Sequence, residues 1–164
     1  ILFHRENRVD WKRMKTDMIR PIAICLFRND DRILVLVGHD DVKGDDFCRP
    51  LGGGINFGET SRDALVREMR EELGAEVEGL HLVDVIESIF THNGQMGHEI
   101  VFVYDASFCD RAMYEKGIIE CREDNGARFT AMWLSLDEMH ASQIRLVPDG
   151  VEKLLLAHNG CAGL

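Results

Sequence analysis

Residues 53–74 join a glycine-rich loop to a segment with helix signals at both of its ends. Thr60 can cap a helix N-terminus, and Asp63 follows three residues later, as in a capping box. An acidic residue in the first turn also suits the helix dipole. Gly74 stands where a left-handed residue commonly ends a helix. The sequence therefore predicts a helix over residues 60–73, with a local signal for each of its two ends.

Three glutamates crowd one face of this predicted helix. Glu68, Glu71 and Glu72 are spaced i, i+3 and i+4, and each like-charge pair costs an isolated helix about 0.2 to 0.5 kcal/mol. The carboxylates are therefore expected at the edge of a core, where a bound cation would relieve the repulsion. The apolar stripe beside them consists of Leu65, Met69 and Leu73.

The loop ahead of the helix contains Gly52, Gly53, Gly54 and Gly58. Few bulky side chains stand in this loop, so its backbone amides and carbonyls can approach an ion or a phosphate closely.

The spacing of these residues resembles the signature of the Nudix hydrolases. That signature is Gly, five residues, Glu, seven residues, Arg-Glu, an aliphatic residue, any residue, Glu-Glu, any residue, Gly and a final aliphatic residue. Two positions depart from the usual pattern, Ala75 in place of a larger aliphatic residue and Leu51 in place of the proline that often precedes the Gly-Gly pair. Neither position carries charge, so both bear on loop geometry more than on activity. The matching residues are Gly53, Glu59, Arg67, Glu68, Met69, Glu71, Glu72 and Gly74.

The resemblance implies a metal site with catalytic residues on the helix. Glu68 and Glu72 would be metal ligands, and Glu71 would be a further ligand or the base that positions the attacking water. The backbone carbonyl of Gly52 would complete part of the metal shell, and Arg67 would orient a catalytic glutamate. Such oxygen ligands suit Mg²⁺, for which Mn²⁺ can substitute, and not zinc. The residues with a structural role in the motif would be Gly53, Glu59 and Gly74.

Two residues outside the motif are candidates for the same site. Arg49 precedes the glycine loop and is placed to bind a substrate phosphate, with simple surface exposure as the alternative. Members of the family often add a metal-binding glutamate from a distant loop. The matching region here contains Glu115, Glu120 and Glu123, of which we select Glu120.

A solvated acidic helix face is the alternative explanation of the glutamates. In that case Arg67 merely pairs with Glu71 at i+4 and stabilises the helix surface. A solvated face does not require a fixed Arg-Glu-x-x-Glu-Glu register behind a glycine loop, so the metal site is favoured. The ion pair between Arg67 and Glu71 is compatible with both.

Length and charge limit the domain count and the partners. The 164 residues suffice for one domain with a sizeable core. The net charge is −10, and the first twenty residues carry +3, which leaves −13 for the remainder. Such a body does not attract a polyanion, so bulk nucleic acid is excluded as a partner and a small nucleotide-type substrate is favoured. We expect an N-terminal extension (1–18), one domain (19–158) and a C-terminal tail (159–164).

The cysteines and the hydropathy favour a cytoplasmic protein without a membrane segment. Five cysteines show no Cys-x-x-Cys pair, and an odd number argues against a disulfide framework. No run approaches eighteen apolar residues, and the N-terminus lacks the apolar core of a signal peptide. The oligomeric state is left open, with a homodimer among the options.

Apolar runs of strand length flank the predicted helix. Residues 22–27, 33–37 and 100–104 are nearly continuous, as expected for strands covered on both faces. Asn93-Gly94 indicates a hairpin with a somewhat long loop between strands 80–90 and 99–108. The pattern predicts an α/β fold with a mixed β-sheet between helices, and the resemblance implies the same α/β/α sandwich. Further expected elements are a strand at 129–134, a short helix near 136–142 and a C-terminal helix starting at Pro148. Segments 40–46, 92–97 and 110–127 are predicted to be loops.

The resemblance implies a metal-dependent hydrolase of a diphosphate linkage in a nucleoside diphosphate attached to another moiety. Two alternatives remain, a nucleotide-binding sensor without turnover and an isomerase of an isoprenoid diphosphate. The intact set of Glu68, Glu71 and Glu72 favours catalysis over binding alone, and no evident pair of Cys and Glu supports the isomerase. ADP-ribose, dinucleoside polyphosphates, oxidised nucleoside triphosphates and sugar nucleotides all stay open as substrates.

Overall fold

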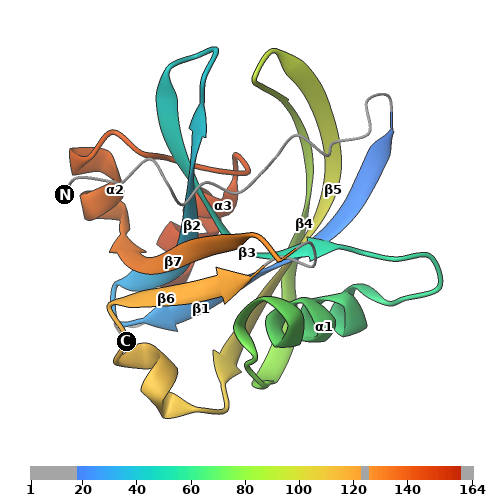
Figure 1. Cartoon of the computed structure of the whole chain (residues 1–164), viewed down its shortest axis with the longest axis vertical. Helices are drawn as coiled ribbons and strands as arrows, with labels where there is room; N and C mark the ends of the chain where they lie inside the picture. Colours follow the sequence, from blue (N-terminus) through green and yellow to red (C-terminus); the bar gives the residue numbers. More distant parts are fainter. Residues whose placement is uncertain (1–17, 123–125, 160–164) are drawn as a thin grey trace.

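The computed structural model describes residues 18–122 and 126–159 (Figure 1). The predicted N-terminal extension and C-terminal tail lie almost entirely outside these residues. The strands are β1 (Ile19–Asn29), β2 (Arg32–Asp40), β3 (Asp45–Gly54), β4 (Val77–His92), β5 (Gln95–Phe108), β6 (Ile118–Arg122), β7 (Arg128–Ser135) and β8 (Arg145–Leu146). The helices are α1 (Ser61–Leu73), the short 3-10 helix η2 (Arg111–Tyr114), α2 (Leu136–Ala141) and α3 (Val151–Asn159).

The described strands form a mixed sheet in the order β4-β5-β1-β3-β2-β7-β6, with β8 paired to β3. β1 runs parallel to β5, and β8 runs parallel to β3, whereas the other pairs are antiparallel. The prediction of a mixed sheet is confirmed.

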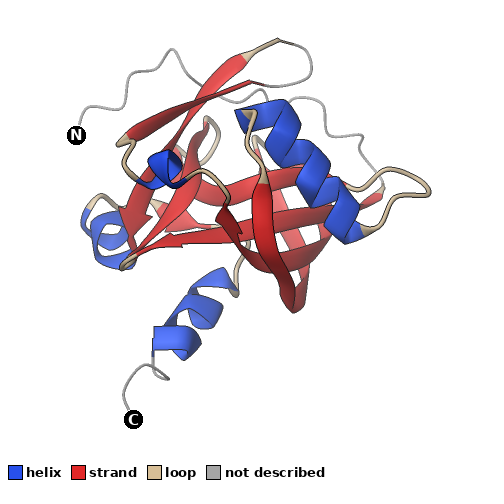
Figure 2. Ribbon diagram, turned by 90° about the horizontal axis from the view of Figure 1, so that it is seen from below, coloured by secondary structure: helices blue, strands red, loops and turns tan. Residues whose placement is uncertain are grey.

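Both faces of the central strand β1 are buried, which explains its nearly continuous apolar sequence. Ala23, Cys25 and Phe27 point to the face where α1 packs with Leu65 and Met69. The alternate residues Ile22, Ile24 and Leu26 point to the other face, where α2 and α3 contribute Met139, Val151 and Leu155. Figure 2 shows α1 on one side of the sheet and α3 on the other. The predicted α/β/α layering is therefore confirmed.

Strand β3 changes partner along its length, and this divides the sheet. Its first part, from Asp45 to Pro50, pairs with β2, and its second part, from Leu51 to Gly54, pairs with β1. The β2–β3 hairpin consequently extends beyond β1. It rises beside the β4–β5 hairpin at the same end of the molecule (Figure 1).

Helix α1 has the ends that the sequence predicts. The Thr60 hydroxyl accepts the Asp63 N–H at 3.1 Å, and Gly74 ends the helix with φ 61°. One detail differs, because the Asp63 carboxylate accepts from the Thr60 hydroxyl and not from the Thr60 backbone N–H as in a full capping box.

Two connections differ from the prediction. The loop between β4 and β5 is only the two-residue turn Asn93-Gly94, with φ 49° and 76°, because both residues tolerate positive φ. The segment 110–127, expected to be a loop, contains η2 and the strand β6. Only two side chains of β6, Ile119 and Cys121, are buried, so its sequence lacks the apolar run of a central strand.

Helix α3 begins later than expected. Its first residue is Val151, three positions after the predicted start at Pro148. Val151 and Leu155 are buried and Leu154 is partly buried, so the predicted apolar face is present.

Candidate active site

The three helix glutamates lie at the boundary between core and solvent. Glu68 and Glu72 are half-buried, one turn apart, beside the buried Leu65 and Met69, whereas Glu71 is exposed. Glu72 lies close enough to β6 that its charge, after burial, helps to raise the pKa of the Cys121 thiol to about 12. The predicted placement at the edge of a core is confirmed for Glu68 and Glu72, but not for Glu71.

The Arg67 guanidinium connects the glycine loop to the helix glutamates. Its Nε and Nη2 donate to the two Glu59 oxygens at 2.8 and 3.0 Å. Its Nη1 donates to Glu68 Oε1 at 2.8 Å and to Glu71 Oε2 at 2.9 Å. Nη2 also donates to the carbonyl oxygen of Gly54 at 2.9 Å. The i+4 pair with Glu71 exists, but it is one part of a network that orients Glu68 and closes the loop.

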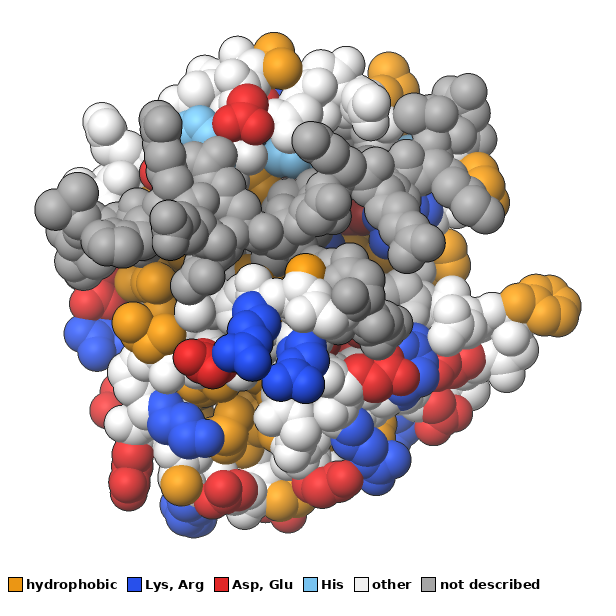
Figure 3. Space-filling model, viewed as in Figure 1, with side chains coloured by type: hydrophobic (Ala, Val, Ile, Leu, Met, Phe, Trp, Pro, Cys, Tyr) orange, Lys and Arg blue, Asp and Glu red, His pale blue; other side chains and the backbone are white. Residues whose placement is uncertain are grey.

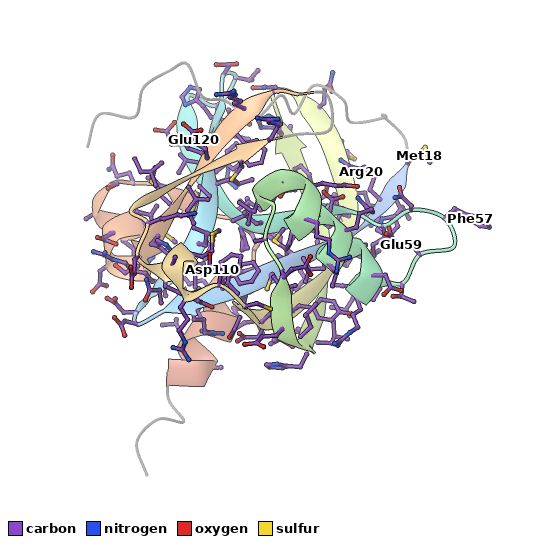
Figure 4. The ribbon with its side chains drawn as sticks, turned by 60° about the horizontal axis from the view of Figure 1, so that its bottom comes forward. Met18, Arg20, Phe57, Glu59, Asp110 and Glu120 are labelled. Carbon is purple, nitrogen blue, oxygen red and sulfur yellow. The ribbon has the colours of Figure 1, made fainter. Side chains whose placement is uncertain are left out.

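Glu59 is the anchor of that loop. Besides its paired bonds from Arg67, it accepts the backbone N–H of Asn56 at 3.0 Å. These bonds lower the pKa of Glu59 from 4.5 to about 2. The hydrogen bonds from Arg67 are the largest cause, and the bond from the Asn56 N–H comes second. Glu59 is thus a permanent anion at neutral pH, and Figure 4 shows it beside the N-terminal end of α1.

We expect the Glu59→Gln variant to be less stable than the wild type at neutral pH, with a deficit that disappears in acid. The folded-state pKa of Glu59 is depressed, so its stabilising effect is present above the unfolded pKa near 4.5 and is lost as the pH falls towards 2. Denaturant midpoints of both proteins between pH 7 and pH 2.5 measure this effect, with the exposed Glu78→Gln as control. A difference between wild type and Glu59→Gln that stays constant over this range would contradict the assignment.

Gly52 and Gly53, which the sequence assigns to a loop, lie at the end of β3, and close contacts require glycine at both positions. A Cβ on Gly53 would lie 2.4 Å from Cδ and 2.5 Å from Oε1 of Glu68, so the Glu68 carboxylate occupies the space that a side chain would fill. Gly52 has φ 141°, and a Cβ there would lie 2.0 Å from the carbonyl oxygen of Ala23 in β1. The backbone at the end of β3 and the Glu68 carboxylate are therefore in direct contact.

A cleft lies between the β2–β3 and β4–β5 hairpins. One wall includes Phe47 and Arg49 of β3, and the opposite wall includes Phe90 and His92 of β4 and Glu99 of β5. The segment before α3, with Pro148, lines the cleft as well. The cleft thus combines apolar and aromatic surfaces with a few charged groups, as is typical of a small-molecule site.

Arg49 links this cleft to the helix glutamates. It is half-buried, and not exposed as the alternative interpretation required. Burial lowers the pKa of Arg49, while the negative charges of Glu99, Glu72 and Glu68 act to raise it. Arg49 is therefore influenced both by Glu99 in the cleft and by two of the helix glutamates. An arginine keeps its proton at neutral pH. It is therefore a fixed cation between the cleft and the helix carboxylates.

The structure does not bring Glu120 to this group. Glu120 is exposed on β6, and the neighbouring Cys121 points into the core on the side of α1. Figure 4 shows Glu120 away from Glu59 and the start of α1. Glu115 is exposed at the end of η2, and Glu123 lies outside the described residues. The assignment of Glu120 as a metal ligand stays a prediction.

The donors on α1 fit a hard divalent cation by their chemistry. Glu68, Glu71 and Glu72 offer carboxylate oxygens, and the backbone of Gly53 lies against the Glu68 carboxylate. Among the described residues, three or more His, Cys, Asp or Glu side chains do not converge on one point. In this arrangement Arg67 holds one oxygen each of Glu68 and Glu71.

The cleft residues Phe47, Asp40 and His92 were not identified from the sequence. They lie on two hairpins far apart along the chain, and the sequence indicated only that segments 40–46 and 92–97 were loops. Phe47 offered a weak signal as a strand aromatic two residues before Arg49.

The visible face of the molecule carries both signs of charge. Figure 3 shows acidic and basic side chains intermixed among the described residues, and not a continuous basic surface.

Comparisons with known proteins point to one family. A sequence model described as the NUDIX domain matches residues 18–154. Curated proteins gave no match. None of the helices in the described ranges has the length and apolar character needed to span a membrane.

Solved structures share this fold. A MutT NUDIX hydrolase from Burkholderia pseudomallei is 24% identical with a TM-score of 0.58, and the match covers 85% of this chain and 98% of that chain. A NUDIX hydrolase from Nitrosomonas europaea is 19% identical with a TM-score of 0.58, covering 87% and 90%. A mutator MutT protein from Bacillus halodurans is 17% identical with a TM-score of 0.51, covering 84% and 80%.

Proposed function

This chain belongs to the Nudix family, and on that premise we propose that it is a metal-dependent hydrolase of a diphosphate linkage in a nucleoside diphosphate joined to another moiety. Hydrolysis of pyrophosphate bonds in nucleotide-type compounds is the general activity of the family, and its members generally use divalent metals. The observation that carries the proposal is the Arg67 network. The network holds Glu59, Glu68 and Glu71 in one arrangement against the glycine-rich segment. A solvated acidic surface does not need such a fixed arrangement.

We assign the metal-binding role to Glu68, Glu72, Glu71 and the backbone carbonyl of Gly52, with Mg²⁺ as the ion and Mn²⁺ as a substitute. When bound, the ion would neutralise phosphate oxygens and lower the pKa of the attacking water. Arg67 orients Glu68 through the bond from Nη1. Glu71, the most exposed of the three glutamates, serves as a further ligand or accepts the proton of the water.

The cleft supports binding of the rest of the substrate. Arg49 would contact a phosphate at the end of the cleft nearest the helix glutamates. Phe47 and Phe90 offer the apolar surface that the ring of a nucleoside requires. A nucleotide-type diphosphate has both features, with charged phosphates at one end and a planar ring at the other.

We expect the Gly53→Ala variant to lose activity about 10-fold to 100-fold while keeping its fold. A Cβ there would meet the Glu68 carboxylate at 2.4 Å, and this group is the end of a flexible side chain that can move aside. Gly54→Ala is a matched control, because no heavy atom of the described residues lies within 4 Å of its Cβ position. Steady-state kinetics and melting temperatures of both variants measure the effects. Equal loss of activity in the two variants would show that the contact between Gly53 and Glu68 is not the cause of the loss.

The experiment that tests the proposed function is a substrate panel with the purified protein and Mg²⁺. The panel contains ADP-ribose, a dinucleoside polyphosphate, an oxidised nucleoside triphosphate and a sugar nucleotide, ranked by kcat/KM from coupled phosphate release. Cleavage of one or more compounds at a phosphoanhydride bond is the expected result. Tight binding without cleavage of any compound would favour the sensor instead.

A further inference from the structure

The carboxylate of Asp40 is buried at the tip of the β2–β3 hairpin. Asp40 is the last residue of β2, and its relative exposure is only 1%. A buried carboxylate requires several hydrogen bonds to offset the loss of water. Its partners therefore show what this residue does in the fold.

The partners of Asp40 come from both hairpins. Within its own hairpin, Oδ1 accepts the backbone N–H groups of Val42 at 3.0 Å and Lys43 at 2.9 Å. From the β4–β5 hairpin, Oδ2 accepts the backbone N–H of Asn93 at 3.2 Å. His92 Nδ1 lies 3.6 Å from the same oxygen. One carboxylate thus joins the two hairpin tips.

Neighbouring contacts connect the tips at the same place. The Asn93 side-chain oxygen accepts the backbone N–H of Asp41 at 2.7 Å, and the Lys43 ammonium donates to the carbonyl oxygen of Thr91. Although burial alone would raise the pKa of Asp40, the backbone bonds from Lys43, Asn93 and Val42 lower it. Asp40 therefore remains a carboxylate at neutral pH, with both oxygens engaged as acceptors.

These contacts lie at the edge of the cleft. Asp40 and His92 both line it, and the rings of Phe47 and His92 meet edge to face across the two hairpins at 5.3 Å between centroids. The Phe47 ring lies over Gly38 of β2, where a Cβ would meet the ring at 2.5 Å. The separation of the two walls is thus set where Asp40 joins the tips.

We infer that Asp40 is a positioning residue, whose carboxylate holds the two hairpin walls of the cleft together and thereby fixes the binding of the nucleoside portion of the substrate. This inference rests on the proposed function, because it takes the cleft as the substrate site. Asp40 does not touch the helix glutamates, so it acts on binding and not on the chemical step.

The Asp40→Asn variant tests the inference, with Asp46→Asn as matched control. The new amide places an N–H₂ group among backbone N–H donors, and Asn93 then loses its charged acceptor. Asp46 is also an aspartate on the β2–β3 hairpin, but its partner His39, at 2.6 Å, lies on the same hairpin. Only the first substitution removes a link between the hairpins.

Amide exchange of Asn93, measured by NMR, reports on the link without any substrate. We expect exchange at least about tenfold faster in Asp40→Asn than in wild type, and unchanged in Asp46→Asn. Unchanged exchange of the Asn93 amide in Asp40→Asn would overturn the inference even if the enzyme is active.

Binding of ADP in the presence of Mg²⁺, measured by calorimetry, reports on the consequence for the cleft. We expect about tenfold weaker binding in Asp40→Asn, with kcat on the best panel compound within about twofold of wild type. A merely structural role would lower kcat and the melting temperature together and would leave the affinity of the folded fraction unchanged. That result, or a wild type that does not bind ADP, would overturn the inference, whereas failure of the proposed function would show as no cleavage of any panel compound.

Discussion

We expect excess EDTA to abolish hydrolysis by the purified protein, and added Mg²⁺ or Mn²⁺ to restore it. The donors on α1 are hard oxygens, which both ions accept in octahedral shells. Without an ion, the half-buried carboxylates of Glu68 and Glu72 would repel the phosphate groups of the substrate. The loss should therefore reach the background rate.

Phosphate release measured before and after readdition of each ion tests this expectation. EDTA saturated with Mg²⁺ beforehand is the control for effects of the chelator itself, and circular dichroism shows whether the fold persists. Full activity in excess EDTA would refute the metal assignment.

The Glu72→Gln variant is expected to hydrolyse the best substrate about 10² to 10⁴ times more slowly than wild type at saturating Mg²⁺. Glu72 follows Glu68 by one turn on the carboxylate face. The amide keeps the size and helix propensity of the side chain but removes its charge, so binding of the ion weakens. The fold should be undisturbed, or slightly more stable without metal, because like-charge repulsion falls.

Kinetics at several Mg²⁺ concentrations separate weaker ion binding from slower chemistry in this variant. Glu78→Gln, exposed on β4 outside the helix, is the control and should change little. Near-equal rates for Glu72→Gln and wild type, on a compound that the wild type demonstrably cleaves, would show that these glutamates are not the catalytic centre.

The elements that the sequence predicts well are those specified by local signals. Thr60 and Gly74 define the ends of α1 through interactions within a few residues, so their roles are readable without the rest of the chain. The apolar runs of β1 and β2 follow from burial on two faces, which periodicity reports directly. The register of Arg67 with Glu68 and Glu71 is likewise set by one helix.

The cleft could not be predicted, because it depends on contacts between distant segments. Asp40 meets the Asn93 amide across 53 positions of sequence, and neither residue carries a local signal for the other. The strand β6 was missed for a similar reason, since it is completed by pairing with β7 and not by its own apolar content. The change of partner along β3, which lets the β2–β3 hairpin extend beyond β1, has no periodic signature either.

The shared guanidinium of Arg67 has a consequence for the order of folding and metal loading. Glu59, Glu68 and Glu71 already have a common counter-ion within the protein, supplied by the chain itself. Zinc fingers are the opposite case, because their ligands have no such partner and the chain stays unfolded until the metal arrives. On the proposed function, this protein would therefore be able to complete its fold before it takes up the ion. The metal would then control activity without deciding whether the protein folds.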